Sequence, residues 1–226
     1  MKPTNKYSVR SRISEGKFRE LVRCFALDLN AYQAAAMTHL NRNTINRHWM
    51  LFRLRIAEQC ELYSPLAGQV EVDESYFGPK RVRGLPGRGA GKKTIVFGIL
   101  ERNSRVYTRI VPHCARELIQ SIIQGKVSRE SVVHSDGYGC YDGLVDLGYQ
   151  KHIRIRHCKG EFARGAAHIN GIESFWSYAK RRLLKFHGVP QKTFYLHLKE
   201  CEFRFNNRHL DLYQVLLKMC RERPLS

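Results

Sequence analysis

The spacing of apolar residues changes near Pro65, and this change divides the chain into two parts. Before it, apolar residues recur at the i, i+3, i+4 and i+7 positions of one helical face, as in residues 18–25. After it, apolar and polar residues alternate, as in residues 69–77, with the period of a half-buried strand. Because the two periods cannot be exchanged, we predict a small all-helical domain over residues 1–66 and an α/β domain over residues 67–226.

Three helices are expected in the first part, after a loose arm over residues 1–16. The first begins at Lys17, the second covers residues 31–38, and Asn43 is a suitable N-cap for the third. The third helix is expected to bury an apolar stripe made of Ile45, Trp49, Phe52 and Ile56. Its outward face is expected to carry Asn46, Arg47, Met50 and Arg53. This arrangement is similar to a helix-turn-helix unit over residues 17–59, and a plain helical cap on the second domain is the alternative.

The second part has the element order of a ribonuclease H-like fold. Three strands that form a meander are followed by a helix, a strand, a helix, a strand and further helices. The expected strands are residues 69–77, 94–101, 105–112, 131–135 and 152–156. The expected helices are residues 115–124, 141–147, 168–184, 192–205 and 212–220. The fold class is therefore α/β, a mixed sheet with flanking helices.

The charge of the chain limits its partners. The 226 residues include 39 Lys and Arg against 20 Asp and Glu, so the net charge is +19 and the pI is about 9.9. A polyanion is the natural counterpart of such a surface, because each neutralised phosphate releases a condensed counterion. An anionic membrane surface would also attract the chain, and a high charge can serve solubility alone, but the size of the excess favours nucleic acid.

Residues 79–93 form a glycine-rich loop with six basic residues. Part of it resembles a phosphate-binding P-loop, but Lys93 occupies the position that a P-loop gives to Ser or Thr, and a strand follows where a P-loop needs a helix. We interpret the segment as a hairpin loop that grips the DNA backbone.

The seven cysteines are scattered and none forms a C-x-x-C pair. This pattern argues against a disulfide framework and a zinc ribbon and is typical of a reducing cytoplasm. The N-terminus is polar, and the apolar runs are too short to span a bilayer. We therefore expect a soluble protein of the cytoplasm that does not contact membranes.

Three carboxylates stand where a sheet of this order would bring them together. Asp73 lies in the first strand, Asp136 follows the fourth, and Glu173 lies on the helix after the last strand. Two hard cations held by such oxygens can assist both the attacking and the leaving oxygen of a phosphodiester. Other carboxylates are compatible with exposed edge positions, namely Glu71, Glu74, Asp142 and Asp146.

Three blocks around these carboxylates resemble DDE transposases of bacterial insertion sequences. They are residues 72–78 (VDESYFG), 134–137 (HSDG) and 168–176 (HINGIESFW). The third block is similar to the branch with the pattern H-x-N-x-I-E-x-F-W-x-x-x-K, and the resemblance covers residues 66–207. It implies a ribonuclease H-like fold, two Mg²⁺ or Mn²⁺ ions per site and catalysis by Asp73, Asp136 and Glu173. Many relatives begin with a zinc ribbon, which this chain lacks.

The resemblance also implies a catalytic role for Lys180, which follows Glu173 by about two helical turns and can hold a DNA phosphate. Trp176 and Phe175 are interpreted as core residues. Residues expected to orient the metal ligands are His134, His168 and Asn170. Residues expected to contact DNA are Arg47, Arg53, Arg81, Arg83, Arg88, Lys92, Lys93, Lys180 and Arg181.

These observations predict a transposase associated with the bacterial nucleoid. It would bind the ends of its own element on double-stranded DNA as a homodimer or larger assembly, cleave a strand at each end and transfer it to target DNA. A domesticated DNA-binding regulator and a structure-specific nuclease without strand transfer are the alternatives.

Overall fold

The structure is a computed structural model that describes residues 5–62, 65–78, 93–136, 139–155 and 169–226. The chain forms two compact units, one made of Met1–Gln59 with Asn207–Ser226 and the other of Cys60–Asn206. The C-terminal segment, which the sequence analysis grouped with the α/β domain, therefore belongs to the helical unit. The backbone of Leu225 bonds to that of Tyr7 and Val9, and this pairing ties the two ends of the chain together.

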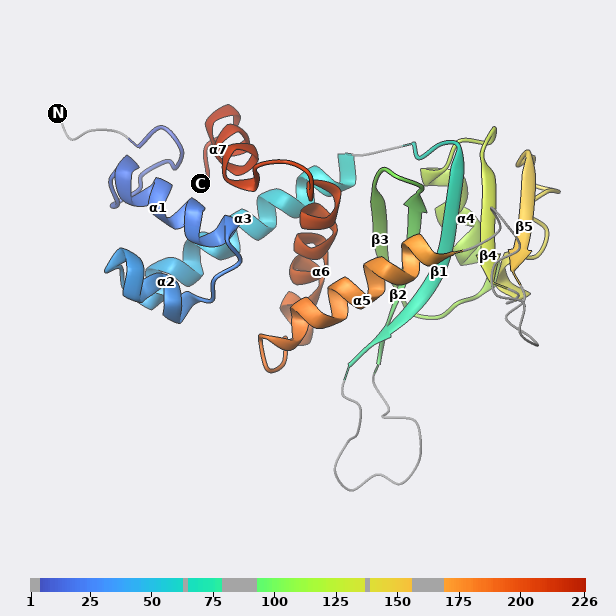
Figure 1. The fold of residues 1–226 in the computed structure, drawn as a ribbon, viewed down its shortest axis with the longest axis horizontal. Helices are drawn as coiled ribbons and strands as arrows, with labels where there is room; N and C mark the ends of the chain where they lie inside the picture. The colour runs from blue at the N-terminus through green and yellow to red at the C-terminus, as the bar shows by residue number, and fades with distance from the viewer. Residues whose placement is uncertain (1–4, 63–64, 79–92, 137–138, 156–168) are drawn as a thin grey trace, which may run out of the picture. The chain divides into compact units, whose positions relative to one another are not determined.

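The helical unit contains α1 (Glu15–Ala26), α2 (Ala31–Thr38), most of α3 (Arg42–Leu62) and α7 (Leu212–Glu222) (Figure 1). The side chain of Ser14 caps α1, and Asn30 forms a capping box with Gln33 at the start of α2. The helix α3 begins one residue before the predicted cap Asn43, whose backbone N–H donates to the side chain of Asn41. The three predicted helices are thus present.

Two details of this unit differ from the predictions. The expected loose arm is ordered from residue 5, because Tyr7 is buried and stacks on Phe18 with ring centroids 5.4 Å apart. Arg53 does not face outward: it is 8% exposed, and its guanidinium lies over the ring of Phe25 at 5.9 Å. The predicted apolar stripe of α3 is confirmed, since Ile45, Trp49, Phe52 and Ile56 are all buried.

The second unit is built on a five-stranded sheet with the order β3-β2-β1-β4-β5. Antiparallel pairs join β1 to β2 and β2 to β3, whereas β4 pairs in parallel with both β1 and β5. The predicted meander and the later parallel strands are therefore both present. The strands are β1 (Gln69–Phe77), β2 (Thr94–Glu101), β3 (Val106–Val111), β4 (Val132–Asp136) and β5 (Lys151–Ile155).

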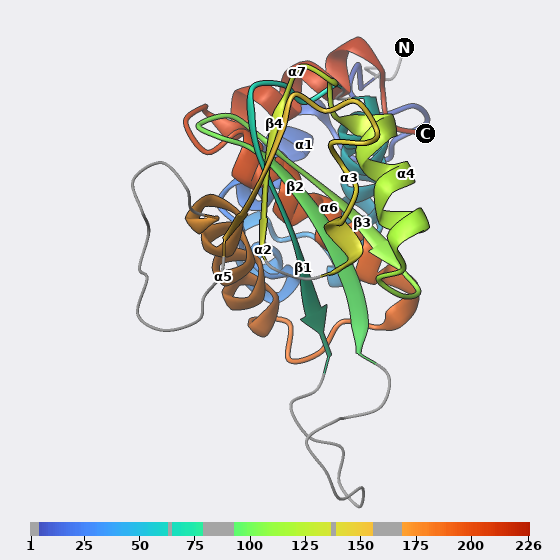
Figure 2. The ribbon, with the colours of Figure 1, turned by 90° about the vertical axis from the view of Figure 1, so that its right-hand side faces the viewer.

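Helices cover both faces of the sheet. On one face, α4 (Arg116–Lys126) contributes Ile119, Ile122 and Ile123 to an apolar core with β1, β2 and β4. On the other face, α5 (Asn170–Leu184) and α6 (Gln191–Asn206) form a second core with β1, β2 and β3. Figure 2 shows α4 and α5 on opposite sides of the sheet. No helix within the described ranges has the length and apolar composition needed to cross a bilayer.

The predicted helix over residues 141–147 is wrong. The segment after β4 is a short 3-10 helix, Gly139–Tyr141, followed by turns. Gly143 and Gly148 have φ angles of 84° and 87°, a left-handed conformation that an α-helix cannot contain. Apolar residues at helical spacing were therefore not sufficient to form a helix here.

The edge strand β3 is covered by polar side chains of α6. The side chain of Asn206 bonds to both the N–H and the C=O of Val106. Glu202 accepts from the N–H of Thr108 at 2.9 Å, and Lys199 donates to the C=O of the same residue at 2.8 Å. Helix α6 thus satisfies backbone groups that an edge strand leaves open.

Candidate active site

Asp73 and Asp136 lie on neighbouring strands. Glu71 of β1 is the register partner of His134 of the parallel strand β4. Continuing this register by two residues places Asp136, the last residue of β4, beside Asp73. Both side chains are partly buried. The predicted adjacency of the two strands is therefore confirmed.

The electrostatic environment of Asp73 is acidic. Burial raises the pKa of Asp73 to about 7, and the charges of Glu74 and Asp136 act in the same direction. Burial also raises the pKa of Glu74, which accepts a 2.6 Å hydrogen bond from the hydroxyl of Tyr141. Within the described ranges, no Lys or Arg forms an ion pair with Asp73 or Glu74. A positive ion would therefore relieve the repulsion in this group.

The start of α5 is fixed to β1 by Glu71. This carboxylate is fully buried, accepts from the backbone N–H of Ile172 at 2.9 Å and pairs with Arg102 at 2.8 Å. A Cβ on Gly171 would approach Glu71 Oε2 and Leu100 Cδ2 to 2.9 Å, so a larger residue at this position would displace these side chains. The interpretation of Glu71 as a possible exposed edge residue is wrong.

One turn further along α5, a second contact reaches the same face of β1. The indole N–H of Trp176 donates to Asp73 Oδ2 at 2.9 Å, and Trp176 is buried as predicted. Glu173 lies between the two anchored positions, Ile172 and Trp176. The helix is thereby held along β1, with Glu173 on its exposed side.

Glu173 does not join the other two carboxylates in this structure. No group of three or more His, Cys, Asp and Glu side chains with metal-binding geometry occurs among the residues that the structure describes. Glu173 sits at the border of the buried face of α5, where Ile172, Phe175, Trp176 and Ala179 are all buried.

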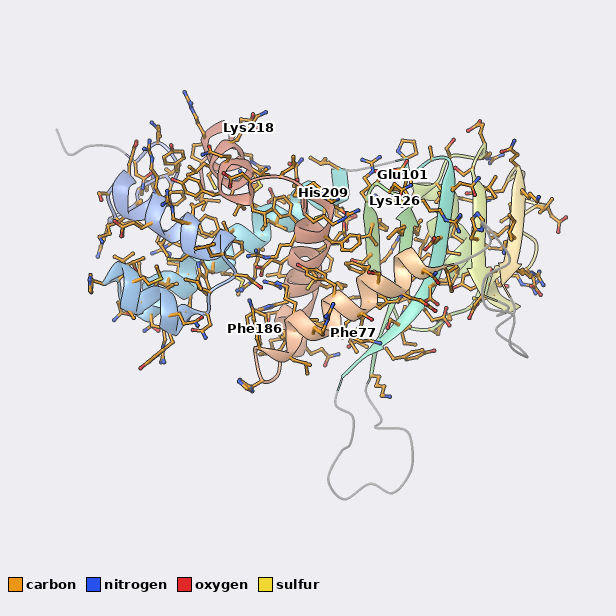
Figure 3. The ribbon with its side chains drawn as sticks, in the orientation of Figure 1. Phe77, Glu101, Lys126, Phe186, His209 and Lys218 are labelled. Atoms are coloured by element: carbon orange, nitrogen blue, oxygen red, sulfur yellow. The ribbon has the colours of Figure 1, made fainter. Side chains whose placement is uncertain are left out.

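Lys180 is exposed on α5, and its ammonium lies 5.7 Å from the ring centroid of Phe77. Phe77 is the last residue of β1, and Figure 3 shows it beside α5. This contact places Lys180 near the end of β1, beyond Asp73.

The residues predicted to orient the metal ligands or to contact DNA are partly described by the structure. His134 is buried, and its Nε2 lies 2.5 Å from Gln69 Oε1. Asn170 is exposed at the first position of α5. Exposed basic residues that were predicted to contact DNA are Arg47, Lys93, Lys180 and Arg181. The predicted residues that lie outside the described ranges are His168, Arg81, Arg83, Arg88 and Lys92.

Comparison with known proteins agrees with this architecture. The sequence model of the ISXO2-like transposase domain matches residues 65–206, more than half of the chain. The chain belongs to this family. The matched range almost coincides with the unit Cys60–Asn206, so the transposase domain comprises the sheet with α4, α5 and α6, and the whole helical unit lies outside it.

Two relatives of this transposase domain come from different organisms. An uncharacterised transposase-like protein of Haemophilus influenzae is 42% identical over 114 residues, which are 50% of this chain and 91% of that protein. An uncharacterised protein in the transposable element ISH50 of Halobacterium salinarum is 29% identical over 154 residues. That match covers 62% of this chain and 52% of the Halobacterium protein, so the chain spans about half of that relative's length.

Two solved structures were also matched at low similarity. One is a Mos1 strand transfer complex, with 12% identity and a TM-score of 0.36, covering 98% of this chain and 79% of the other. The second is a Mos1 transposase paired-end complex with the left transposon end, with 12% identity and a TM-score of 0.30, covering 100% and 82%. At these scores a likeness does not establish a common fold.

Proposed function

We propose that this transposase domain binds the ends of its own mobile element and catalyses metal-dependent cleavage and strand transfer of DNA. The observation that carries the proposal is the environment of Asp73. Its pKa is raised to about 7 by burial and by two neighbouring carboxylates, and no cationic side chain of the described residues pairs with it. An acidic cluster of this kind inside a protein of net charge +19 is suited to hold a cation that the protein does not supply.

The donor set fits Mg²⁺ or Mn²⁺, because all its ligands are carboxylate oxygens. Asp73 and Asp136 would hold two ions together with Glu173, which α5 carries along the same strand. Bound in this way, the ions would activate the attacking oxygen and stabilise the leaving oxygen of the scissile phosphodiester. Glu71 bonds to the start of α5 and Gly171 packs against it; this attachment would keep Glu173 near the strand ends.

Residues along α5 would then position the DNA. We propose that Lys180 holds a backbone phosphate beyond Asp73, where its ammonium lies against Phe77. Arg181 is exposed on the next position of the helix and would act in the same way. Point charges of this kind fix the register of a duplex without reading its sequence.

We further propose that the sheet is a ribonuclease H-like one, on the basis of its strand order and its mixture of antiparallel and parallel pairs. The helices α1 to α3 would act as a helix-turn-helix unit that recognises the element ends. The exposed Arg47 near the start of α3 supports this assignment, because the N-terminal residues of a recognition helix contact base edges. A homodimer or larger assembly would process both ends together.

The test replaces Glu173 by Gln, which keeps side-chain size and helix propensity but removes the charge that a hard cation needs. The matched control is Glu117→Gln, because Glu117 is also exposed in the first turn of a helix of the same unit. Cleavage and joining are measured on DNA that carries the segments flanking the gene, at saturating Mg²⁺ and matched DNA occupancy.

We expect Glu173→Gln to lose ~10²-fold or more in rate, equivalent to about 3 kcal/mol of transition-state stabilisation, with unchanged DNA binding. The Glu117→Gln control should cleave like the wild type. Equal rates for the two variants would remove Glu173 from the site. Cleavage without joined products would leave a nuclease rather than a transposase.

A further inference from the structure

The indole ring of Trp176 is held in one place by the strand beneath it. Gly98 of β2 is the register partner of Asp73. A Cβ on Gly98 would lie 2.5 Å from Trp176 Cζ2 and 2.7 Å from Cη2, distances that no real contact reaches. The ring therefore packs directly on the backbone of β2, and only glycine leaves room for it.

The polar edge of the same ring faces Asp73. Its N–H donates to Oδ2 at 2.9 Å, while the ring itself is only 5% exposed. An indole nitrogen can only donate, and a carboxylate rotates broadly about its last torsion unless a donor fixes it. The hydrogen bond consequently occupies Oδ2 and sets the plane of the carboxylate.

The other tryptophan of the chain provides a contrast. Trp49 is buried to a similar extent in the helical unit, but its N–H has no hydrogen-bond partner among the described residues. Burial of an indole therefore does not by itself require an acceptor in this protein. The pairing of Trp176 with Asp73 depends on Gly98, which admits the ring to that position.

We propose that Trp176 is a positioning residue for the cation site. By holding Oδ2 of Asp73, it leaves Oδ1 available to a divalent cation shared with Asp136. This inference rests on the proposed function, because it assumes that Asp73 is a metal ligand. It assigns to Trp176 a role beyond packing in the core. Groups that orient a metal ligand in this way typically change metal affinity tenfold to a hundredfold.

Metal binding to the full chain without DNA tests the proposal. Affinity for Mg²⁺ is measured by calorimetry for the wild type, Trp176→Phe, Trp49→Phe and Asp73→Asn. A second readout uses Tb³⁺, which prefers oxygen ligands and emits when a nearby tryptophan is excited. Because the chain has two tryptophans, the emission of single variants identifies which of them lies near the ion.

We expect Trp176→Phe to bind Mg²⁺ about 10- to 100-fold more weakly and to lose the sensitised Tb³⁺ emission. Trp49→Phe should keep both the affinity and the emission. Gly98→Ala, which displaces the ring but retains the indole, should also weaken Mg²⁺ binding. This variant keeps the test valid if Trp176→Phe does not fold, as judged by circular dichroism.

Two results would overturn different claims. Wild-type Mg²⁺ affinity in folded Trp176→Phe or Gly98→Ala, together with loss of binding in Asp73→Asn, would refute the positioning role and leave the proposed function intact. Wild-type affinity in Asp73→Asn would refute the proposed function itself.

Discussion

Two groups of buried carboxylates in the transposase domain have opposite surroundings. On α6, Glu200 pairs with Arg182 and Arg204, and Glu202 pairs with Lys199. On β1, Asp73 accepts a side-chain hydrogen bond from Trp176 and Glu74 accepts one from Tyr141, and both donors are neutral. The carboxylates of the first group are paired with cationic side chains, whereas no Lys or Arg of the described residues pairs with Asp73 or Glu74.

The pKa values depend on burial as well as on neighbouring cations. Burial raises the pKa of Glu61, but contact with Lys199 outweighs burial, so the pKa of Glu61 is lowered. Burial lowers the pKa of Lys199, but its acidic neighbours outweigh burial, so the pKa of Lys199 is raised. The pKa of the fully buried Glu202 is raised, because burial outweighs its contact with Lys199. Asp73 has no such cation and its pKa rises to about 7. The carboxylates of α6 are thus balanced by cationic side chains, whereas the charge of Asp73 is balanced by no cation of the described residues.

The largest effect is expected from Lys199→Met. Lys199 is fully buried and bonds to Glu61, Glu202 and the C=O of Thr108, so its removal leaves a buried carboxylate without compensation. The free energy of unfolding should fall by about 3–5 kcal/mol, measured by denaturant titration. Lys192→Met on the exposed part of the same helix is the control and should change stability by less than about 0.5 kcal/mol. Similar effects of the two variants would contradict the comparison.

Asp73→Asn should raise the free energy of unfolding, whereas Lys199→Met lowers it. The raised pKa means that the folded chain retains a proton on Asp73 that the unfolded chain has released, so ionisation of Asp73 costs stability. The cost is absent below the ordinary value of 3.8, grows as the pH rises and is complete above about 7. Without divalent cations, the variant should be more stable than the wild type at pH 8, by at most about 4 kcal/mol.

The pH dependence provides the check on this prediction. The stability difference between Asp73→Asn and the wild type should shrink as the pH is lowered from 8 to 4. Asp146→Asn, at an exposed position of the same unit, should show no such trend. A difference that is constant with pH would show that Asp73 is not perturbed by its neighbours.

Mg²⁺ should stabilise the wild type and not Asp73→Asn. A ligand present at about ten times its Kd adds ~1.4 kcal/mol to the free energy of unfolding when it binds only the folded state. The measurement is a thermal melt with and without Mg²⁺, with NaCl at equal ionic strength as the control. Equal shifts in both proteins would place the cation elsewhere.

The smallest effect on stability is expected from Lys180→Ala. Lys180 is exposed, and its contact with the Phe77 ring contributes about 0.5 kcal/mol. DNA affinity should nevertheless fall, and the slope of log affinity against log salt should decrease by about 1, as for one lost phosphate contact. Lys192→Ala should leave the slope unchanged. An unchanged slope for Lys180→Ala would remove it from the DNA-binding surface.

Periodicity was sufficient to predict most elements of the fold. The bounds of α2, β1 and β2 agree with the expected ranges, because each has a clear apolar period that ends at a turn or cap. The period failed after β4, where glycines with positive φ interrupt the helical pattern. It also failed at Arg53, which lies on the buried side of α3 near Trp49 and Ile56 and holds its guanidinium over the ring of Phe25.

The acidic site was predictable only in part. Asp73 and Asp136 follow from the strand pattern and the sequence blocks, but the contacts that arrange them join distant parts of the chain. Glu71 meets Ile172 across 101 residues, and Asp73 meets Trp176 across 103. The spacing of residues within one helix or strand does not predict pairs that are so far apart in the sequence. Gly98 and Gly171 were the available signals, because each stands inside a regular element where glycine is otherwise unfavourable.

The cover that α6 provides for β3 also restricts how copies of this chain can associate. Lys199, Glu202 and Asn206 occupy the backbone groups of Val106 and Thr108 through which another strand would pair. Two molecules therefore cannot merge their sheets across β3 into one continuous sheet, and any assembly on DNA must be held by other surfaces. The same three side chains act against fibrous aggregation, so a variant that loses all three together should accumulate as insoluble protein.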